Sequence, residues 1–209
     1  MAPLQNALIS VAVVVLAAGR SSRMERSGHK LLARFRGVTL VRLAALAATG
    51  CESGSVVMVT GYRGTDIEAE IAGLELSVVR NLHYADGMAS SIVLGVRRAA
   101  DFDPDGIMIM LADMPLLKTK DLVTLIGAFR TSSAKAIVRA ACDGVPGNPV
   151  IFPRSAFAAL QGLRGDNGAR AIISQFALDV IDVEIGVSAK MDIDTAEQLF
   201  AFGAQPEAN

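Results

Sequence analysis

Short runs of apolar residues recur along the chain, and most of them show no alternation with polar residues. Such runs are typical of strands in a parallel sheet, where helices cover both faces. The pattern predicts strands over residues 11–16, 55–60, 76–80, 107–111, 136–139, 150–152 and 180–183.

Between these runs, apolar residues recur with the spacing of amphipathic helices. The pattern predicts helices over residues 38–48, 65–71, 90–99, 120–129, 155–160 and 168–176, and a last helix over 195–202. This alternation predicts an α/β fold, with a Rossmann-like, doubly wound and mostly parallel sheet flanked by helices. We expect one domain over residues 1–209, with its core at about 11–202, because the turns at 101–106 and 143–147 are no linkers.

The composition narrows the classes of function. The 209 residues are 52% hydrophobic and carry 20 basic against 21 acidic side chains, which excludes a general nucleic-acid binder but not a local basic pocket. The apolar stretch over residues 7–19 follows no Lys or Arg and is too short to span a bilayer, which favours a buried strand over a signal peptide. Cys51 and Cys142 show neither a zinc spacing nor a CxxC motif. Buried thiols in a reducing cytoplasm are the simplest interpretation, and a disulfide stays open.

The first predicted strand ends in a loop rich in small and cationic residues. The small residues let a ligand approach the backbone, whose consecutive N–H groups can form an anion-binding concavity. The cations add an Arg fork matched to phosphate oxygens and a Lys point charge. These two sets are Ala17, Ala18 and Gly19, and Arg20, Arg23 and Lys30. The loop predicts a triphosphate cradle, although a solvated surface loop fits it equally well and neither GxxxxGK(S/T) nor GxGxxG is present.

Three aspartates near predicted element ends are candidate cation ligands. Asp113 follows the strand over 107–111, at the same sheet edge as the first loop, and Mg²⁺ prefers one or two carboxylates with phosphates and water. Asp192 and Asp194 are two residues apart, so in an extended segment their side chains point the same way. We favour Asp192 as the partner of Asp113. The alternatives are that Asp113 only begins a turn and that Asp194 or Thr195 caps the last helix.

Two further polar segments precede predicted elements. Gly87 lies before Ser90 and Ser91, which open the helix over 90–99 and either cap it or face a nucleobase edge or ribose. Gly147 and Asn148 lie in a Gly-Pro loop before the strand over 150–152, with Asn148 at its tip.

The remaining polar residues are less distinctive. Asp166 is a candidate cap for a helix that starts near Asn167, and the flanking Arg164 and Arg170 are candidates for a substrate phosphate. His29 lies in the cationic loop and is a candidate for contact with phosphate, although an incidental role is the simpler interpretation for both His29 and His83.

Six motifs occur in the order found in MobA-like nucleotidyltransferases, and the chain resembles this family. They are LAAGRSSRM followed by Lys30, GMASS, LADMP, GNPVIF, GDNGAR and DIDTAEQL. The resemblance extends from Val11 to Leu199 and is strongest to the molybdenum cofactor cytidylyltransferase branch. It implies a Mg²⁺-dependent transfer of CMP from CTP to the molybdopterin of the molybdenum cofactor, with release of pyrophosphate.

The resemblance also implies partners and residue roles. The product would serve hydroxylases of the xanthine dehydrogenase type, so we expect transient contact with such an enzyme but no nucleic acid and no membrane. The choice of cytosine over guanine rests on the branch alone. The implied roles are Leu16, Ala17, Ala18, Gly19, Gly87, Ser90 and Ser91 for the nucleotide, Arg23, Lys30 and Asp113 for catalysis, Asp113 and Asp192 for Mg²⁺, and Gly147, Asn148, Asp166 and Arg170 for the pterin substrate.

The chain departs from the family pattern at two places. Glu25 stands where the family usually has Gly, in a longer stretch between Met24 and Lys30, and Asn148 stands where many cytidylyltransferases have His. Three alternatives therefore stay open. They are an NAD(P)H-dependent reductase similar to nicotine blue oxidoreductase, a non-catalytic molybdenum cofactor carrier, and a transferase for a sugar or polyol phosphate.

Overall fold

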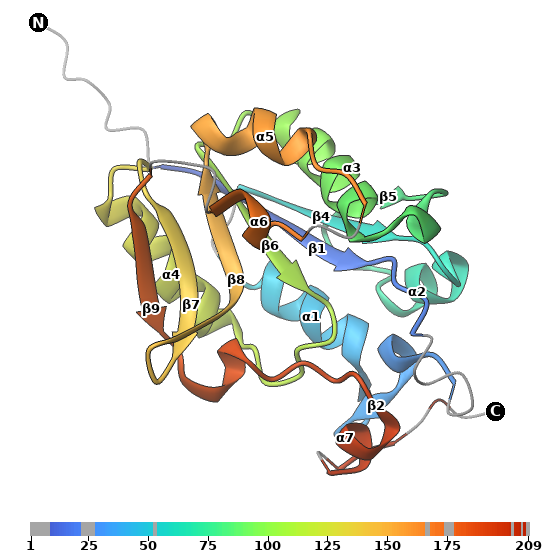
Figure 1. The fold of residues 1–209 in the computed structure, drawn as a ribbon. Coiled ribbons are helices and arrows are strands. Elements are labelled where there is room, and N and C mark those ends of the chain that lie inside the picture. Colours follow the sequence, from blue (N-terminus) through green and yellow to red (C-terminus); the bar gives the residue numbers. More distant parts are fainter. Residues whose placement is uncertain are drawn as a thin grey trace, which may run out of the picture.

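The computed structural model describes residues 9–21, 28–51, 54–165, 168–173, 178–201, 203–205 and 207. Within these residues, seven strands form one sheet in the order β5-β4-β1-β6-β8-β7-β9 (Figure 1). They are β1 (Val11–Ala17), β4 (Ser55–Thr60), β5 (Ser77–Arg80), β6 (Gly106–Leu111), β7 (Ile137–Cys142), β8 (Val145–Pro153) and β9 (Val180–Glu184). Only β8 runs antiparallel to its neighbours, so the mostly parallel sheet is confirmed.

Helices cover both faces of the sheet (Figure 1). The α-helices are α1 (Leu40–Thr49), α2 (Gly64–Glu70), α3 (Met88–Ala100), α4 (Thr119–Thr131), α5 (Phe157–Gln161), α6 (Arg170–Ile173) and α7 (Ala196–Ala201). Short 3-10 helices are η2 (Lys30–Leu32), η3 (Tyr84–Asp86), η4 (Arg154–Ala156) and η5 (Gly186–Ala189). Every predicted helix therefore has a counterpart, although residues 174–176 and 202 lie outside the described residues.

The alternation of side chains along β1 divides the core into two layers. Val13 and Val15 pack on one face with residues of α1 and α4, and Ala12 and Val14 pack on the other with residues of α3 and α5. A Cβ on Gly95 would lie 2.5 Å from Val14 Cγ1, so this glycine lets α3 lie directly against the sheet. The close contact places the start of α3 at the carboxyl edge of β1, where the candidate site lies.

A second, three-stranded sheet is absent from the sequence-based prediction. It pairs β10 (Ala204–Gln205) with β2 (Arg34–Phe35) and β2 with β3 (Val38–Thr39). The helix predicted from residue 38 accordingly begins at Leu40. The cause is a two-residue turn in which Arg36 and Gly37 both have positive φ, a conformation that closes a tight hairpin.

The segment around Asn148 also differs from the prediction. Residues 145–149 of the expected loop belong to a strand, because the turn contains only Asp143 and Gly144, both with positive φ. Asn148 therefore lies inside β8 rather than at a loop tip, and the Asn148–Pro149 peptide bond is cis. The hairpin aligns β8 with both β6 and β7 and carries Gly147 and Asn148 to the carboxyl edge of β6.

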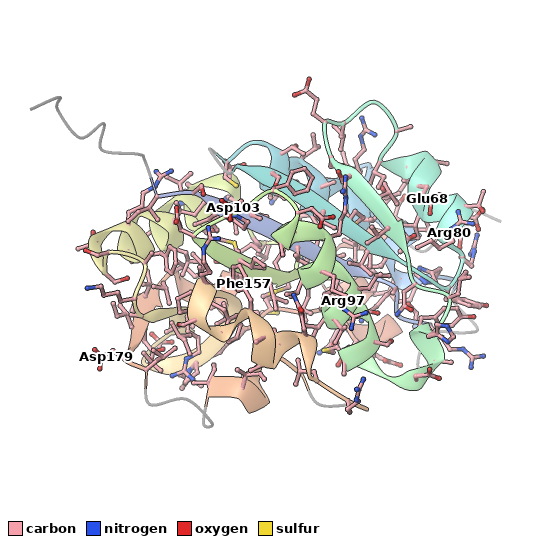
Figure 2. All side chains as sticks on the ribbon, turned by 90° about the horizontal axis from the view of Figure 1, so that it is seen from above. Glu68, Arg80, Arg97, Asp103, Phe157 and Asp179 are labelled. Carbon is pink, nitrogen blue, oxygen red and sulfur yellow. The ribbon has the colours of Figure 1, made fainter. Side chains whose placement is uncertain are left out.

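The edge strand β5 carries a charged side-chain pair with α2. On the edge strand β5, Arg80 donates hydrogen bonds to Glu68 of α2, and Figure 2 shows this pair at one side of the molecule. Charged side chains of this kind protect an exposed sheet edge.

Cys51 and Cys142 are buried and form no disulfide. Among the described helices, none combines the length and apolarity that a membrane crossing needs.

Candidate active site

A cavity of about 570 Å³ opens at the carboxyl ends of β1 and β6. Its wall includes the first loop after β1, η2, the start of α3 and the segment after η5. Polar and backbone groups converge there from distant parts of the sequence, and the lining residues of interest are Ala18, Gly19, Arg20, Lys30, Gly87, Ser91, Asp113, Asp192 and Asp194. A polar cavity at this edge of a doubly wound sheet is the usual position of a ligand site. We call it the first cavity.

A second cavity of about 480 Å³ adjoins the first. The two share Leu16, Met88, Leu111 and Asp192 as lining residues. The second cavity is otherwise mainly apolar, with Gly147, Asn148 and Lys190 at its wall. Two ligands could therefore lie side by side, with Asp192 between them.

Lys30 is the centre of an ion-pair cluster in the first cavity. Its Nζ lies 2.5 Å from Asp113 Oδ2 and 3.3 Å from Asp194 Oδ1. Burial lowers the pKa of Lys30, but attraction to the two aspartates outweighs burial, so the pKa is raised and the ammonium is charged. Both Lys30 and Asp113 are largely buried, which strengthens their interaction relative to a surface pair.

One oxygen of Asp113 is left unsatisfied by the described part of the chain. Its Oδ1 is buried and has no hydrogen-bond partner among the described residues. Burial raises the pKa of Asp113, Lys30 opposes this shift, and the nearby Asp192 adds to it. An additional cation stabilises the charged form of a carboxylate that is buried and near another acidic group.

The donor set fits a cation that takes few ligands from the protein. Among the described residues, no three His, Cys, Asp or Glu side chains form a group that could hold a metal ion. Asp113 and Asp192 both line the first cavity and could offer two carboxylates, in which case phosphate oxygens and water would fill the other positions. Magnesium favours this arrangement in nucleotide sites.

In the first loop, the carbonyl groups of Ala18 and Gly19 are bound, whereas the N–H groups of Gly19 and Arg20 are available. Tyr62 N donates to Ala18 O over 3.2 Å, and His29 Nε2 lies 3.1 Å from Gly19 O. The N–H groups of Gly19 and Arg20 have no acceptor among the described residues. Adjacent unpaired N–H groups form an anion-binding concavity, which agrees with the predicted cradle.

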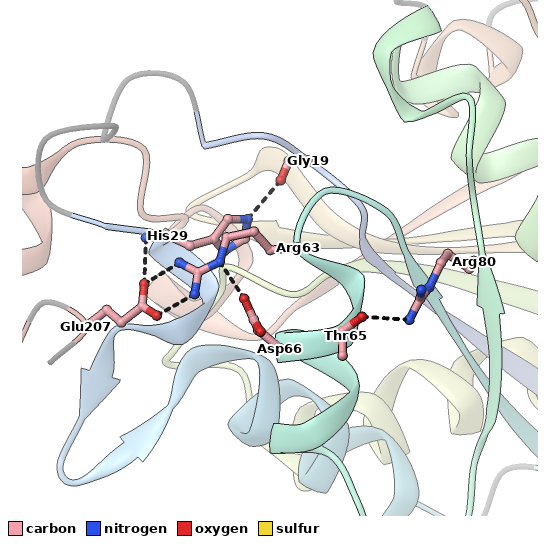
Figure 3. Close-up of polar contacts among 7 residues, drawn as sticks. All are labelled: Gly19, His29, Arg63, Thr65, Asp66, Arg80 and Glu207. Atoms are coloured by element: carbon pink, nitrogen blue, oxygen red, sulfur yellow. Dashed lines mark hydrogen bonds and ion pairs between the residues drawn. The ribbon is translucent and has the colours of Figure 1, made fainter. Parts of the chain in front are cut away.

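His29 makes contacts that the sequence analysis did not predict. Its ring is buried and stacks on Tyr62 with a centroid distance of 5.7 Å, and its backbone N donates to Glu207 Oε2 over 3.2 Å. Figure 3 shows the ring between Gly19 and Glu207, with Arg63 beside it. No local sequence motif indicates these contacts, because they join segments far apart in the chain.

The two serines of α3 occupy different places. Both accept hydrogen bonds from Asn81 Nδ2, over 2.8 Å for Ser90 and 2.9 Å for Ser91. Ser91 lines the first cavity, whereas Ser90 faces a separate groove with Arg164. The helix begins at Met88 after Gly87, whose φ is +99°, so neither serine caps it.

The other predicted site residues are placed as follows. Ala17 is buried in β1 and does not line either cavity. The last helix begins after Thr195, whose Oγ1 accepts from Gln198 N while Gln198 Oε1 accepts from Thr195 N, so Thr195 is its cap. Arg23, Glu25, Asp166 and the side chain of Arg170 lie outside the described residues.

An anion cradle beside acidic residues at the carboxyl edge of such a sheet defines a nucleotide-binding α/β protein. The family model for the MobA-like NTP transferase domain matches residues 13–180, and the chain belongs to this family. It is a nucleotidyltransferase of the MobA-like type, as the six motifs indicated.

One relative agrees with this family, and two solved structures share the fold. The purine catabolism protein PucB of Bacillus subtilis is 30% identical over 194 residues, which cover 88% of this chain and 92% of PucB. A nucleotidyl transferase from Methanothermobacter (Mth528) has a TM-score of 0.77 at 21% identity, over 92% of this chain and 95% of its own. Rv0371c of Mycobacterium tuberculosis, solved in complex with manganese, has a TM-score of 0.74 at 22% identity, over 92% and 97%. At these identities the two structures show the fold alone, and they confirm the Rossmann-like class.

Proposed function

We propose that the protein transfers CMP from CTP to the molybdopterin of the molybdenum cofactor and releases pyrophosphate. The observation that carries the proposal is the pair of adjoining cavities, with the anion cradle in one and Asp192 shared by both. An oxygen of the pterin's terminal phosphate attacks the α-phosphorus of CTP. The bond from this phosphorus to the bridging oxygen of the β-phosphate breaks, and pyrophosphate leaves with the electron pair.

The first cavity would hold the nucleotide. The N–H groups of Gly19 and Arg20 and the side chain of Lys30 would bind the triphosphate, and Arg23 is proposed to join them. Gly87 and Ser91 lie at the wall where the base or ribose would be placed. Fixed donors around the developing charge lower the barrier without a covalent enzyme intermediate.

Asp113 and Asp192 would hold Mg²⁺, with support from the unsatisfied Oδ1 of Asp113. When bound, the ion would neutralise charge on the phosphates. The manganese complex of the Mycobacterium tuberculosis relative agrees with a divalent cation in this fold. In the free protein, Lys30 takes the place of such a cation beside Asp113.

The second cavity would hold the acceptor. Its apolar wall suits the ring system of a pterin, and Lys190 and Asn148 provide polar contacts. Asp166 and Arg170 are proposed to contribute to the same side. The name of PucB supports the choice of acceptor, because xanthine is a purine and the motif resemblance points to hydroxylases of the xanthine dehydrogenase type.

The test is pyrophosphate release from purified protein with molybdenum cofactor, Mg²⁺ and each of CTP, GTP and ATP. We expect release with CTP and a loss of about 10²–10³-fold in Asp113→Asn, because a charge that stabilises the transition state is removed. Asp101→Asn is the matched control, since Asp101 is an exposed aspartate whose partner is Arg98. It should retain full activity.

The outcomes separate the remaining alternatives. Binding of molybdenum cofactor without pyrophosphate release from any nucleotide would identify a carrier. Release with a sugar or polyol phosphate in place of the pterin would identify another acceptor. Oxidation of NADPH in the presence of a quinone-like pigment, without pyrophosphate, would establish the reductase and contradict the proposal.

A further inference from the structure

His29 lies behind the first loop and lines neither cavity. Its ring contacts Tyr62, its Nε2 contacts Gly19 O, and its backbone N contacts Glu207. Glu207 in turn accepts two hydrogen bonds from Arg63, over 2.6 and 2.7 Å. We call the four residues His29, Tyr62, Arg63 and Glu207 the His29 clasp; Figure 3 shows three of them together.

The clasp fixes two successive peptide units of the first loop. In a trans peptide, the carbonyl and the following N–H point in opposite directions. The bond from Tyr62 N to Ala18 O therefore turns the N–H of Gly19 away from Tyr62. The contact of His29 with Gly19 O likewise turns the N–H of Arg20 away from His29. Gly19 and Arg20 line the first cavity, as do the neighbouring Ala18 and Ser21.

We propose that His29 is a positioning residue for triphosphate binding, which acts by donating its Nε2–H to Gly19 O. This inference rests on the proposed function of the first cavity. The contacts fit the neutral tautomer with the proton on Nε2. Gly19 O is a carbonyl oxygen and needs a donor, and a proton on the buried Nδ1 would have no acceptor among the described residues. The clasp then orients the N–H groups of Gly19 and Arg20 before the nucleotide arrives.

The residues around the His29 clasp are closely packed against the first loop. A Cβ on Gly61 would lie 2.8 Å from both Ala18 Cβ and Ala18 O, so no larger residue fits there without displacing the loop. Arg63 has a positive φ of 52° directly before α2, and it also binds Asp66 over 2.6 Å. Two fixed contacts thus hold Arg63 where it meets Glu207.

The first experiment determines the tautomer of His29 by ¹⁵N NMR of histidine-labelled full-length protein. The chain has two histidines, so the spectra of His29→Gln and His83→Gln assign both signals. We expect a protonated Nε2 and an unprotonated Nδ1 for His29 at neutral pH. The opposite tautomer would overturn the proposal, because Nε2 could not then donate to Gly19.

The second experiment measures triphosphate affinity and kinetics in two variants. His29→Leu keeps an apolar side chain against Tyr62 but has no donor, and we expect affinity for CTP with Mg²⁺ to fall about tenfold. His29→Gln can place an amide N–H near the position of Nε2 and should stay within about threefold of wild type. We expect the KM for CTP to rise while the KM for the acceptor is unchanged.

The results distinguish this inference from the proposed function. Wild-type protein that binds none of CTP, GTP, ATP and tripolyphosphate overturns both. Wild-type binding with equal affinity in His29→Leu overturns the inference alone. Equal impairment of the Leu and Gln variants, or a parallel rise of both KM values with a lowered Tm, would indicate a merely structural role and also overturn it.

The third experiment tests the far end of the clasp. Glu207→Ala removes the acceptor of His29 N and Arg63, and CTP affinity should fall by roughly threefold, as expected for a partly exposed pair. Glu197→Ala, an exposed carboxylate on α7, is the matched control and should leave affinity unchanged. Unchanged affinity in Glu207→Ala would remove Glu207 from the clasp and contradict its stated role.

Discussion

At the scale of single residues, the candidate site depends on which polar groups are satisfied within the protein and which are not. The carbonyls of Ala18 and Gly19 have partners, whereas Asp113 Oδ1 and the N–H groups of Gly19 and Arg20 have none among the described residues. Asp113 Oδ1 is buried, and because an unsatisfied buried polar group is costly, this oxygen favours a ligand that will bind it. Gly19 and Arg20 are exposed, so their N–H groups are accessible to a ligand in the first cavity.

The protonation of His29 gives a prediction for stability. Burial lowers the pKa of His29; Gly19 O and Glu207 oppose this shift, and the charges of Arg63 and Lys30 add to it. A group with a lowered pKa in the folded state stabilises the fold above its unfolded pKa and loses that contribution as the pH falls. The Tm of wild type should therefore fall relative to His29→Gln between about pH 7 and pH 5.

Thermal unfolding of both proteins across this pH range checks the prediction. The difference between the two proteins isolates His29 from Glu68, whose lowered pKa does not depend on His29 and affects both proteins alike. A constant difference between the two Tm values would show that His29 does not change its protonation on unfolding.

At the scale of elements, packing against η5 fixes the part of β8 that reaches the second cavity. A Cβ on Gly147 would lie 2.1 Å from Ala189 O, the last residue of η5. Lys190 and Asp192 follow η5 directly, so β8 and η5 together set the position of both side chains at the cavity.

Gly147→Ala should therefore separate these elements. We expect a loss of about 1–3 kcal/mol in the free energy of unfolding from overpacking. The KM for the acceptor should rise more than the KM for CTP. Gly127→Ala is the matched control, because Gly127 lies in α4 with open space around it. It should stabilise the protein by about 0.5–1 kcal/mol. Denaturant unfolding and steady-state kinetics provide both readouts.

The elements show what the sequence could predict and what it could not. The apolar runs located all seven strands of the main sheet. The inner strands β1, β4 and β6 are covered on both faces and therefore require continuous apolar residues, whereas the edge strands β5 and β9 are more exposed. The short strands β2, β3 and β10 were missed, since two residues carry no periodicity and their turn depends on the positive φ of Arg36 and Gly37. Asn148 was misplaced for a related reason: proline and glycine near it predict a loop, but pairing with β6 and β7 makes it a strand.

The site was predictable only where one segment carried the signal. The first loop, Asp113 and Asp192 each follow directly from a local motif, and the structure brings Gly19, Asp113 and Asp192 to one cavity. His29 was overlooked because its role depends on Gly19, Tyr62 and Glu207, which the fold brings together from three segments. The ion pair of Lys30 with Asp194 depends on tertiary structure in the same way.

At the scale of the whole molecule, ligand binding should be visible as stability. The two cavities lie between the first loop, α3, β8 and the segment before α7, so a bound triphosphate would connect elements from most of the chain. A ligand that binds only the folded state adds its binding free energy to the stability of the fold.

We therefore predict that CTP with Mg²⁺ raises the Tm by roughly 5–10 °C when its concentration is about 100 times its Kd, which corresponds to about 2.7 kcal/mol. Chelation with EDTA should remove most of the shift, and Asp113→Asn should respond little to Mg²⁺. An equal shift with and without the metal would show that the carboxylates do not bind a cation together with the nucleotide.

The wall shared by the two cavities has a consequence for turnover. Leu16, Met88, Leu111 and Asp192 border both cavities, so a dinucleotide product would occupy both at once. Its two halves are covalently joined, and the second half binds at the high effective concentration that the first half provides. Such a product should inhibit the enzyme more strongly than either substrate half alone. Release of the product would then limit the rate of turnover. A protein that accepts the product from the enzyme would increase that rate.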